Sequence, residues 1–428
     1  MLSVEIVFLL FASIVFFGFI LQSFFFKLKI SPAFPLMLVG LLIGPVLHLI
    51  QAGQGSTVSA LVPYITALAV SFILFDVGMN MNIRKLGSVL ARANAFTFTT
   101  ALVTAFALFL VAYFVFHWSA FASLIFGFAL AGPSAIISPT LLRVIGIIPD
   151  KLKSTLLYES VATDTLQLIV PLILIGLIVT PLSVTASGIA DAIFTIIIGA
   201  VLLGIILAIA WLYLLNRYQR YSERYSWTLT ISMVVAAYAI SEILGISGVI
   251  TVFVFGLAFS NIGSVIHSGR GWRKYVRYQG RLFDHIKRYQ SEIVFFTSTF
   301  FFVYIGILFQ ITTVTIFLVG LAIALSLVIL MIRMLFVGMI GKYTKIKGVQ
   351  SRKMSLIASF NTSRGLSSAI IATVPISLGI IIPNFLDEMF LIILITNLIS
   401  TVGIFILTKR MKMLPPPPIA ERKAAAAK

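Results

Sequence analysis

Apolar stretches of about 20 residues recur along nearly the whole chain, separated by short polar segments. A stretch of this length, wound as an α-helix, crosses the hydrocarbon core of a bilayer. The runs are continuous, which excludes the short alternating strands of an outer-membrane barrel. The pattern predicts an all-α polytopic membrane protein with 13 transmembrane helices, at residues 4–26, 31–50, 61–82, 89–116, 119–142, 154–179, 185–215, 227–244, 248–266, 292–311, 314–340, 354–382 and 387–408.

Two of these predicted helices contain helix-breaking residues near their centres. Residues 131–139 interrupt the helix at 119–142, and residues 361–368 interrupt the helix at 354–382. Gly or Pro in a single membrane helix commonly marks a simple kink. A matched pair of interrupted helices running in opposite directions is instead typical of an inverted-repeat transporter. We therefore expect two crossed discontinuous helices, the fifth and the twelfth.

The inverted repeat also predicts the domain organisation. We expect a single transmembrane transporter domain over residues 1–408 and a cytoplasmic tail over residues 409–428. Within the domain, the first repeat covers 1–179, a linker helix covers 185–215, and the second repeat covers 227–408.

The charge supports a membrane protein once its position is considered. The chain is 60% hydrophobic and 10% charged, with a formal net charge of +18. A net charge this basic would suggest a nucleic-acid partner, but the Lys and Arg residues gather in every second connection. The other connections contain none: 51–60, 117–118, 180–184, 245–247, 312–313 and 383–386. The positive-inside rule then places the N-terminus outside the cell membrane and the C-terminus in the cytoplasm. The basic residues face anionic lipid, and no nucleic acid is expected as a partner.

Two further segments have sequence features of their own. The apolar run 4–26 begins with Glu5, and its basic residues follow the run, which favours a retained first helix over a cleaved leader. In 267–291, aromatic residues recur at helical spacing among basic ones. This spacing predicts an interfacial amphipathic helix on the inner leaflet, with a regulatory or partner-binding role as the alternative.

The candidate chemistry lies on the predicted helix 154–179. Asp164 falls near its middle, with Ser160 and Thr163 on the same side. A carboxylate at bilayer depth is costly and usually marks a functional site. Carboxylate and hydroxyl oxygens suit a hard monovalent cation. Burial also favours the protonated form of a carboxylate, so cation and proton can compete for Asp164. The structural alternative is a buried Asp satisfied by neighbouring helices.

Other charged residues receive different interpretations. Arg364 lies deep in the membrane, and we expect it to form a structural ion pair with Glu159; breaking such a pair costs ~3–5 kcal/mol. Arg333, near the inner end of its helix, is expected to snorkel to water. Asp76 lies near an inner helix end, where it attracts cations, contributes a ligand or simply reaches water. Glu242 lies at a helix end and receives no role.

Four motifs resemble those of the sodium/proton exchangers in the cation:proton antiporter superfamily. Their Glu-Ser-x-x-Asn-Asp motif corresponds to Glu159-Ser160-x-x-Thr163-Asp164, and their Phe-Glu-x-Gly-Leu motif to Phe75-Asp76-Val77-Gly78-Met79. Their Thr-Asp-Pro motif falls at Gly132-Pro133-Ser134, and their Arg-Gly pair matches Ser363-Arg364-Gly365. The resemblance implies a homodimer in which a six-helix core domain moves against a dimerisation domain. It also implies Asp164 as the ion-binding carboxylate, with Ser160, Thr163, Asp76 and the backbone of Ala131 as co-ligands.

The chain departs from the family pattern at two positions. Thr163 replaces the usual Asn, and Gly132 replaces the usual Asp, which leaves the choice among Na⁺, K⁺ and Li⁺ open. The resemblance places paired carboxylates and a lysine on the tenth helix in the electrogenic branch. This chain has Thr163 before Asp164 and no Lys or Arg in 292–311, which predicts electroneutral exchange.

The sequence thus predicts a secondary active antiporter that exchanges a monovalent cation, Na⁺ in the first place, for H⁺ in pH homeostasis. It predicts no enzyme activity and no cofactor, because the transported cation and H⁺ are substrates. The alternatives are a K⁺/H⁺ antiporter on the same fold, a cation channel, an organic-anion symporter and a non-transporting sensor. The single mid-membrane carboxylate at a broken helix favours an antiporter over a channel.

Overall fold

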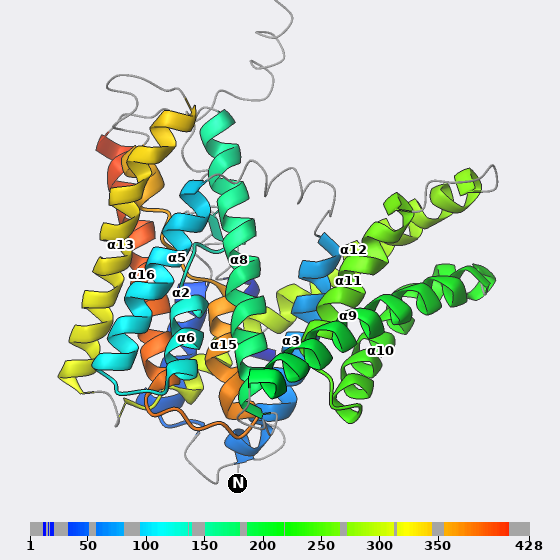
Figure 1. Cartoon of the computed structure of the whole chain (residues 1–428), viewed down its shortest axis with the longest axis horizontal. Helices are drawn as coiled ribbons and strands as arrows, with labels where there is room; N and C mark the ends of the chain where they lie inside the picture. Colours follow the sequence, from blue (N-terminus) through cyan, green and yellow to red (C-terminus); the bar gives the residue numbers. More distant parts are fainter. Residues whose placement is uncertain are drawn as a thin grey trace, which may run out of the picture.

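The computed structural model describes residues 12–13, 16, 18–20, 33–50, 57–80, 95–135, 137–138, 150–179, 186–217, 219–265, 272–311, 315–344 and 355–410. Every labelled element within these residues is helical (Figure 1). The elements are α2 Ala33–Leu41, η1 Leu42–Val46 (a short π-helical stretch), α3 Thr57–Asn80, α5 Ala95–Phe114, α6 Ala120–Ala129, α8 Asp150–Val179, α9 Ala186–Arg217, α10 Gln219–Ile243, α11 Gly248–Val265, α12 Trp272–Leu308, α13 Ile316–Thr344, α15 Leu366–Ser377 and α16 Phe385–Arg410.

The lengths and compositions of these helices confirm a polytopic helical membrane protein. Among the described residues, seven helices are long and apolar enough to cross a membrane, and five shorter apolar helices accompany them. The number of 13 membrane helices stays a prediction, because most of the first predicted helix, 4–26, lies outside the described residues.

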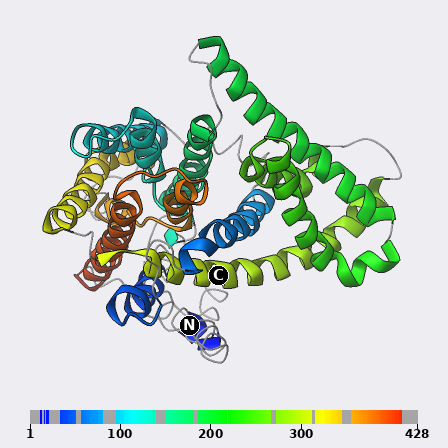
Figure 2. The ribbon, with the colours of Figure 1, turned by 90° about the horizontal axis from the view of Figure 1, so that it is seen from below.

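The helices form two groups (Figure 1). α5, α6, α8, α13, α15 and α16 gather on one side, and α9, α10 and α11 gather on the other. α3 packs against α11, α12 and α15, so it joins the two groups. α12 extends from the α10–α11 group across to α2 (Figure 2). The elements that carry the candidate chemistry, α6, α8 and α15, all contact one another.

Glycines allow α3 and α11 to approach closely. A Cβ on Gly78 of α3 would collide with the carbonyl oxygen of Phe253, and a Cβ on Gly256 of α11 would collide with that of Phe75. Small residues of this kind let membrane helices pack backbone to backbone. The two groups are therefore in close contact near the C-terminal end of α3.

The segment at 267–291 differs from its prediction. Residues Trp272–Leu308 form one continuous helix, α12, so a separate interfacial helix ahead of the tenth membrane helix is wrong. The stretch that joins the two predicted parts, Tyr289-Gln290-Ser291-Glu292, contains neither Gly nor Pro. Nothing in its local sequence stops the α-helix, and the hydrogen bonds of the backbone continue through it.

Both predicted helix interruptions contain unwound backbone. α6 ends at Ala129 and residues 130–135 are not helical; residues 361–365 are likewise not helical before α15 begins. The backbone N–H of Ser134 donates to the carbonyl oxygen of Ser363 over 2.9 Å. Unwound backbone at membrane depth is tolerated where the protein satisfies it, and here the two interruptions partly satisfy each other.

Candidate functional site

Asp164 lies within the membrane span of α8, next to both interruptions. Asp164 is 6% exposed and lies within the apolar span Thr155–Ile178. The side chain of Ser367, in the first turn of α15, and the backbone of Ala135 are its hydrogen-bonding neighbours. The Oδ1 atom has no hydrogen-bond partner in the part of the chain that the structure describes. A buried carboxylate oxygen is rarely left unpaired, so this atom is available to a proton or a cation.

Ser160 and Thr163 lie on the same helix as Asp164, four residues and one residue before it. Both residues are buried on α8. The Ser160 hydroxyl donates to the carbonyl oxygen of Leu157 over 3.0 Å, and the Thr163 hydroxyl donates to that of Glu159 over 2.9 Å. A hydroxyl that donates its single proton to its own helix keeps its lone pairs for another partner. Ser160 and Thr163 can therefore act as oxygen ligands without breaking these bonds.

The two departures from the family motifs contact each other. A Cβ on Gly132 would collide with the Cβ and the hydroxyl oxygen of Thr163. The unwound backbone of the α6 interruption therefore lies directly against the Thr163 side chain. Ala131, the preceding residue, is also buried, at 3% exposed. An Asp at position 132 would not fit beside Thr163 without rearrangement, so the residues at the two positions depend on each other.

Ser368 connects the three elements of the site. Its hydroxyl lies 2.7 Å from the carbonyl oxygen of Ala129 at the end of α6, and 3.0 Å from Oε1 of Gln167 on α8. The hydroxyls of Ser138 and Ser363 and the Nε2 atom of Gln167 have no hydrogen-bond partner among the described residues. Unpaired buried polar atoms of this kind indicate a place for water or a small ion.

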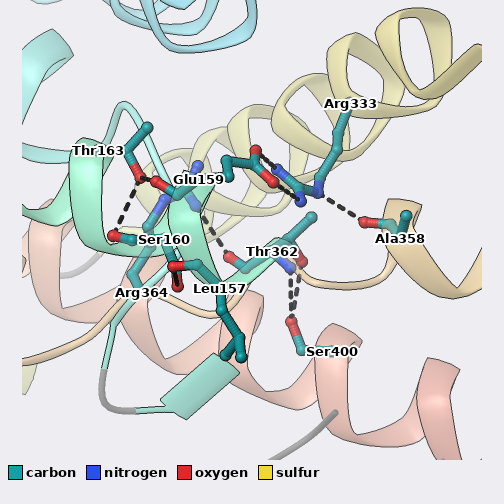
Figure 3. Close-up of polar contacts among 9 residues, drawn as sticks. All are labelled: Leu157, Glu159, Ser160, Thr163, Arg333, Ala358, Thr362, Arg364 and Ser400. Atoms are coloured by element: carbon teal, nitrogen blue, oxygen red, sulfur yellow. Dashed lines mark hydrogen bonds and ion pairs between the residues drawn. The ribbon is translucent and has the colours of Figure 1, made fainter. Parts of the chain in front are cut away.

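The structure corrects the predicted ion pair of Glu159 (Figure 3). Glu159 pairs with Arg333 of α13: Nη1 lies 2.5 Å from Oε1, and Nη2 lies 2.8 Å from Oε2. The Arg333 Nε–H donates to the carbonyl oxygen of Ala358 over 2.8 Å. The predicted Glu159–Arg364 pair and the predicted snorkelling of Arg333 are both wrong. α13 brings the planar guanidinium within reach of both carboxylate oxygens, which gives the strong bidentate geometry.

Arg364 has a different environment. It is 2% exposed, and its Nη1–H donates to the carbonyl oxygen of Thr362 over 3.1 Å. Its Nε–H has no hydrogen-bond partner among the described residues. Asn397 of α16 donates to the Arg364 carbonyl oxygen over 2.7 Å, and the Thr362 N–H donates to the Ser400 hydroxyl over 3.2 Å. These bonds hold the unwound segment against α16.

Asp76 lies apart from the contacts of Asp164. It is half-buried on α3, where its charged and polar neighbours are Asn80 on the same helix and Lys287 on α12. None of the contacts given for Asp76 reaches Asp164 or α8. Its role as a co-ligand stays a prediction.

Sequence analysis missed the roles of Arg333 and Ser367. The only signal for Ser367 was its place at the end of the polar run 361–368. Arg333 is 174 residues from Glu159 in the sequence, so no local pattern links the two.

Comparisons with known proteins identify a family and a similar fold. The sequence profile of the family described as "Sodium/hydrogen exchanger, transmembrane" matches residues 10–410. The fold is similar to the structure at pH 8 of the sodium proton antiporter MjNhaP1 from Methanocaldococcus jannaschii, with a TM-score of 0.69 and 17% identity over 96% of this chain and 98% of that chain. An electron-microscopy structure of the same antiporter matches with a TM-score of 0.68 and 17% identity, over 96% of this chain and 99% of that chain. The search of curated protein sequences found no match.

Proposed function

Because this chain belongs to the sodium/hydrogen exchanger family, a family of membrane transporters, we propose that it exchanges Na⁺ for H⁺ across the cell membrane. The observation that carries the proposal is the unpaired oxygen of Asp164, buried at the meeting point of two interrupted helices. A carboxylate in this position binds either a cation or a proton, and the two exclude each other.

The site supplies the remaining oxygen ligands. Ser160 and Thr163 offer hydroxyl lone pairs on the same helix, and the unwound backbone at Ala131 offers a carbonyl group. Such oxygens replace the hydration shell of a hard cation. Protonation of Asp164 removes the negative charge that holds the cation, so the cation leaves when the proton binds.

The two interruptions suit alternating access. We propose that they are the crossed discontinuous helices of an inverted repeat, with helices 1–6 and 8–13 as the two halves. The hydrogen bond from Ser134 to Ser363 supports this arrangement, because it joins equivalent places of the two halves. Exchange then follows when the group that carries Asp164 moves against the α9–α11 group in a homodimer.

Electroneutral exchange is part of the proposal. One titrating carboxylate takes up one cation or one proton, so a full cycle moves no net charge. The bidentate Glu159–Arg333 pair is already neutral as a unit and is assigned to architecture.

A K⁺/H⁺ antiporter on the same fold is the second candidate, because the Thr163–Gly132 contact changes the shape of the cation site relative to the family motifs.

The test is exchange by purified protein in proteoliposomes that contain a pH-sensitive dye. We expect pulses of Na⁺ to change the internal pH in the wild type and to have no effect in Asp164→Asn, because the amide cannot carry the exchanged proton. Pulses of K⁺ and Li⁺ rank the cations.

The matched control is Glu292→Gln, which makes the same carboxylate-to-amide change at an exposed position of α12. We expect this variant to exchange at the wild-type rate. Undiminished exchange in folded Asp164→Asn would rule out the proposed mechanism. An ion current that persists without a proton gradient or exchange would favour a channel instead.

A further inference from the structure

A cavity of about 230 Å³, whose mainly apolar wall includes one carboxylate and four hydroxyl groups, lies between α3, α8, α15 and the turn that joins α10 to α11. Its lining includes Thr66, Leu172, Tyr238, Glu242, Ser247 and Ser377. The turn belongs to the connection 245–247, which contains no Lys or Arg and is predicted to face outward. The cavity therefore opens on the outer side of the membrane, and none of its lining residues is basic.

Glu242 supplies the carboxylate of this cavity. The backbone N–H of Gly248, at the start of α11, donates to its Oε1 over 2.8 Å. A Cβ on Gly248 would come within 2.9 Å of that oxygen, so the glycine allows the contact. Gly245 makes the turn with a φ of +69°, which favours glycine. The helix end fixes one carboxylate oxygen, while the group keeps further lone pairs for a ligand.

The hydroxyl group of Thr66 is the second polar feature of the cavity. Thr66 is 1% exposed, and its hydroxyl has no hydrogen-bond partner among the described residues. A buried hydroxyl without a partner in a cavity beside a carboxylate indicates water or a cation. At ~30 Å³ per water, the cavity holds about eight water molecules, which accommodates a monovalent cation with its inner hydration shell.

The cavity lies above the Asp164 site along two helices. On α8, Leu168 and Leu172 follow Asp164 at four and eight residues, so they share one side of the helix. At 1.5 Å per residue, Leu172 lies about 12 Å further along α8. On α15, Val374 lines the cavity seven residues after Ser367, about 10 Å further along that helix. The two helices that carry the Asp164 site thus continue as walls of the cavity. The apolar side chains of Leu168 and Leu172 lie along α8 between Asp164 and the cavity.

We propose that this cavity is an outer vestibule in which a hydrated monovalent cation collects beside Glu242 before it reaches Asp164. The inference rests on the proposed cation/proton exchange and adds a residue that sets the apparent affinity for the external cation. Glu242 attracts the cation through its charge. This attraction lowers the KM for the external cation, and dissolved salt weakens it by screening.

The test is Glu242→Gln in the full chain, in right-side-out membrane vesicles at low ionic strength. The amide oxygen still accepts the Gly248 N–H, so the helix end is retained while the charge is lost. Leu172 in the cavity wall lies about 12 Å along α8 from Asp164. For a charge at a separation of that order, with an effective dielectric between that of water and ~20, loss of the charge gives a roughly 2- to 10-fold higher KM for external Na⁺. The kcat stays at the wild-type value. Choline chloride narrows the difference, because the Debye length falls from ~30 Å at 0.01 M to ~8 Å at 0.15 M.

Two controls separate the charge of Glu242 from its structural contact. Glu292→Gln removes one carboxylate at an exposed position of α12 on the predicted cytoplasmic side, and we expect the external KM to stay unchanged. Ser377→Asp adds a charge to the cavity wall, and we expect it to lower the external KM in the wild type and to restore it in Glu242→Gln.

An unchanged external KM in Glu242→Gln overturns the inference and leaves exchange itself intact. If Glu242→Gln fails to fold, the Ser377→Asp variant decides, and an unchanged external KM in it overturns the inference. A wild-type protein that performs no exchange refutes the proposed function, and the vestibule with it.

Discussion

At the scale of single residues, the contact between Gly132 and Thr163 shows how one departure from a motif constrains another. The site leaves no space for a Cβ at position 132, because Thr163 occupies it. Two changes that look independent in the sequence are therefore a single change in the shape of the site. Asp164 contacts the same unwound backbone through Ala135 and the start of α15 through Ser367.

The Gly132 contact predicts the effect of Gly132→Ala. We expect this variant to lose about 1–3 kcal/mol of stability, the usual cost of overpacking, and to exchange more slowly. Thermal unfolding in detergent measures the loss. Gly320→Ala on α13 is the matched control, because its Cβ would meet no atom within 4 Å. Equal stability of the two variants would contradict the close contact.

The buried Glu159–Arg333 pair makes a second prediction. Removing one partner, as in Arg333→Met, leaves an uncompensated buried charge and costs about 3–5 kcal/mol. The double variant Glu159→Gln with Arg333→Met should recover part of that cost, and unfolding in detergent measures the coupling. The same cycle with Arg364→Met is the comparison, since Arg364 forms no ion pair with Glu159 among the described residues. A larger coupling energy between Glu159 and Arg364 than between Glu159 and Arg333 would support the ion pair expected from the sequence.

At the scale of elements, α12 extends a membrane helix beyond the bilayer. Residues Trp272–Leu308 form one helix, although its first half is polar and basic and its second half is apolar. Movement at the N-terminal end of α12 would therefore be transmitted directly to the part of α12 that contacts α2 and α3.

The continuity of α12 can be measured directly, because the chain contains no cysteine. Spin labels at Tyr278→Cys and Phe296→Cys are separated by 18 residues, which predicts about 27 Å along a straight helix. A right-angle bend near Ser291, as expected for an interfacial helix, would shorten this separation to about 21 Å. Pulsed electron-spin distance measurements distinguish the two, and the shorter distance would disprove the single helix.

At the scale of the whole molecule, the distribution of charge predicts the electrical behaviour. Lys287 of α12 is the charged neighbour of Asp76, and no Lys or Arg occurs in 292–311. Asp164 has no basic residue among its contacts. A transport site with one carboxylate and no compensating cation changes its charge by the same amount when it binds Na⁺ or H⁺.

We therefore expect no transport current from the wild-type protein on solid-supported membranes under a sodium gradient alone. The pH change in proteoliposomes should be unaffected by a potassium diffusion potential. Glu292→Gln serves as the control and should also give no current. A sustained current that disappears in Asp164→Asn would show that exchange is electrogenic.

The hydrophobic pattern alone determined which segments are helices in the membrane, because the cost of burying a polar backbone in lipid is paid within each segment. It also identified Asp164 and both interruptions, since a charge or a helix breaker inside an apolar run is visible locally. Only the tertiary structure decided that Glu159 pairs with Arg333, that Gly132 contacts Thr163, and that Glu242 lines a cavity over the site. Such contacts join residues from distant segments, and their choice depends on how the helices pack.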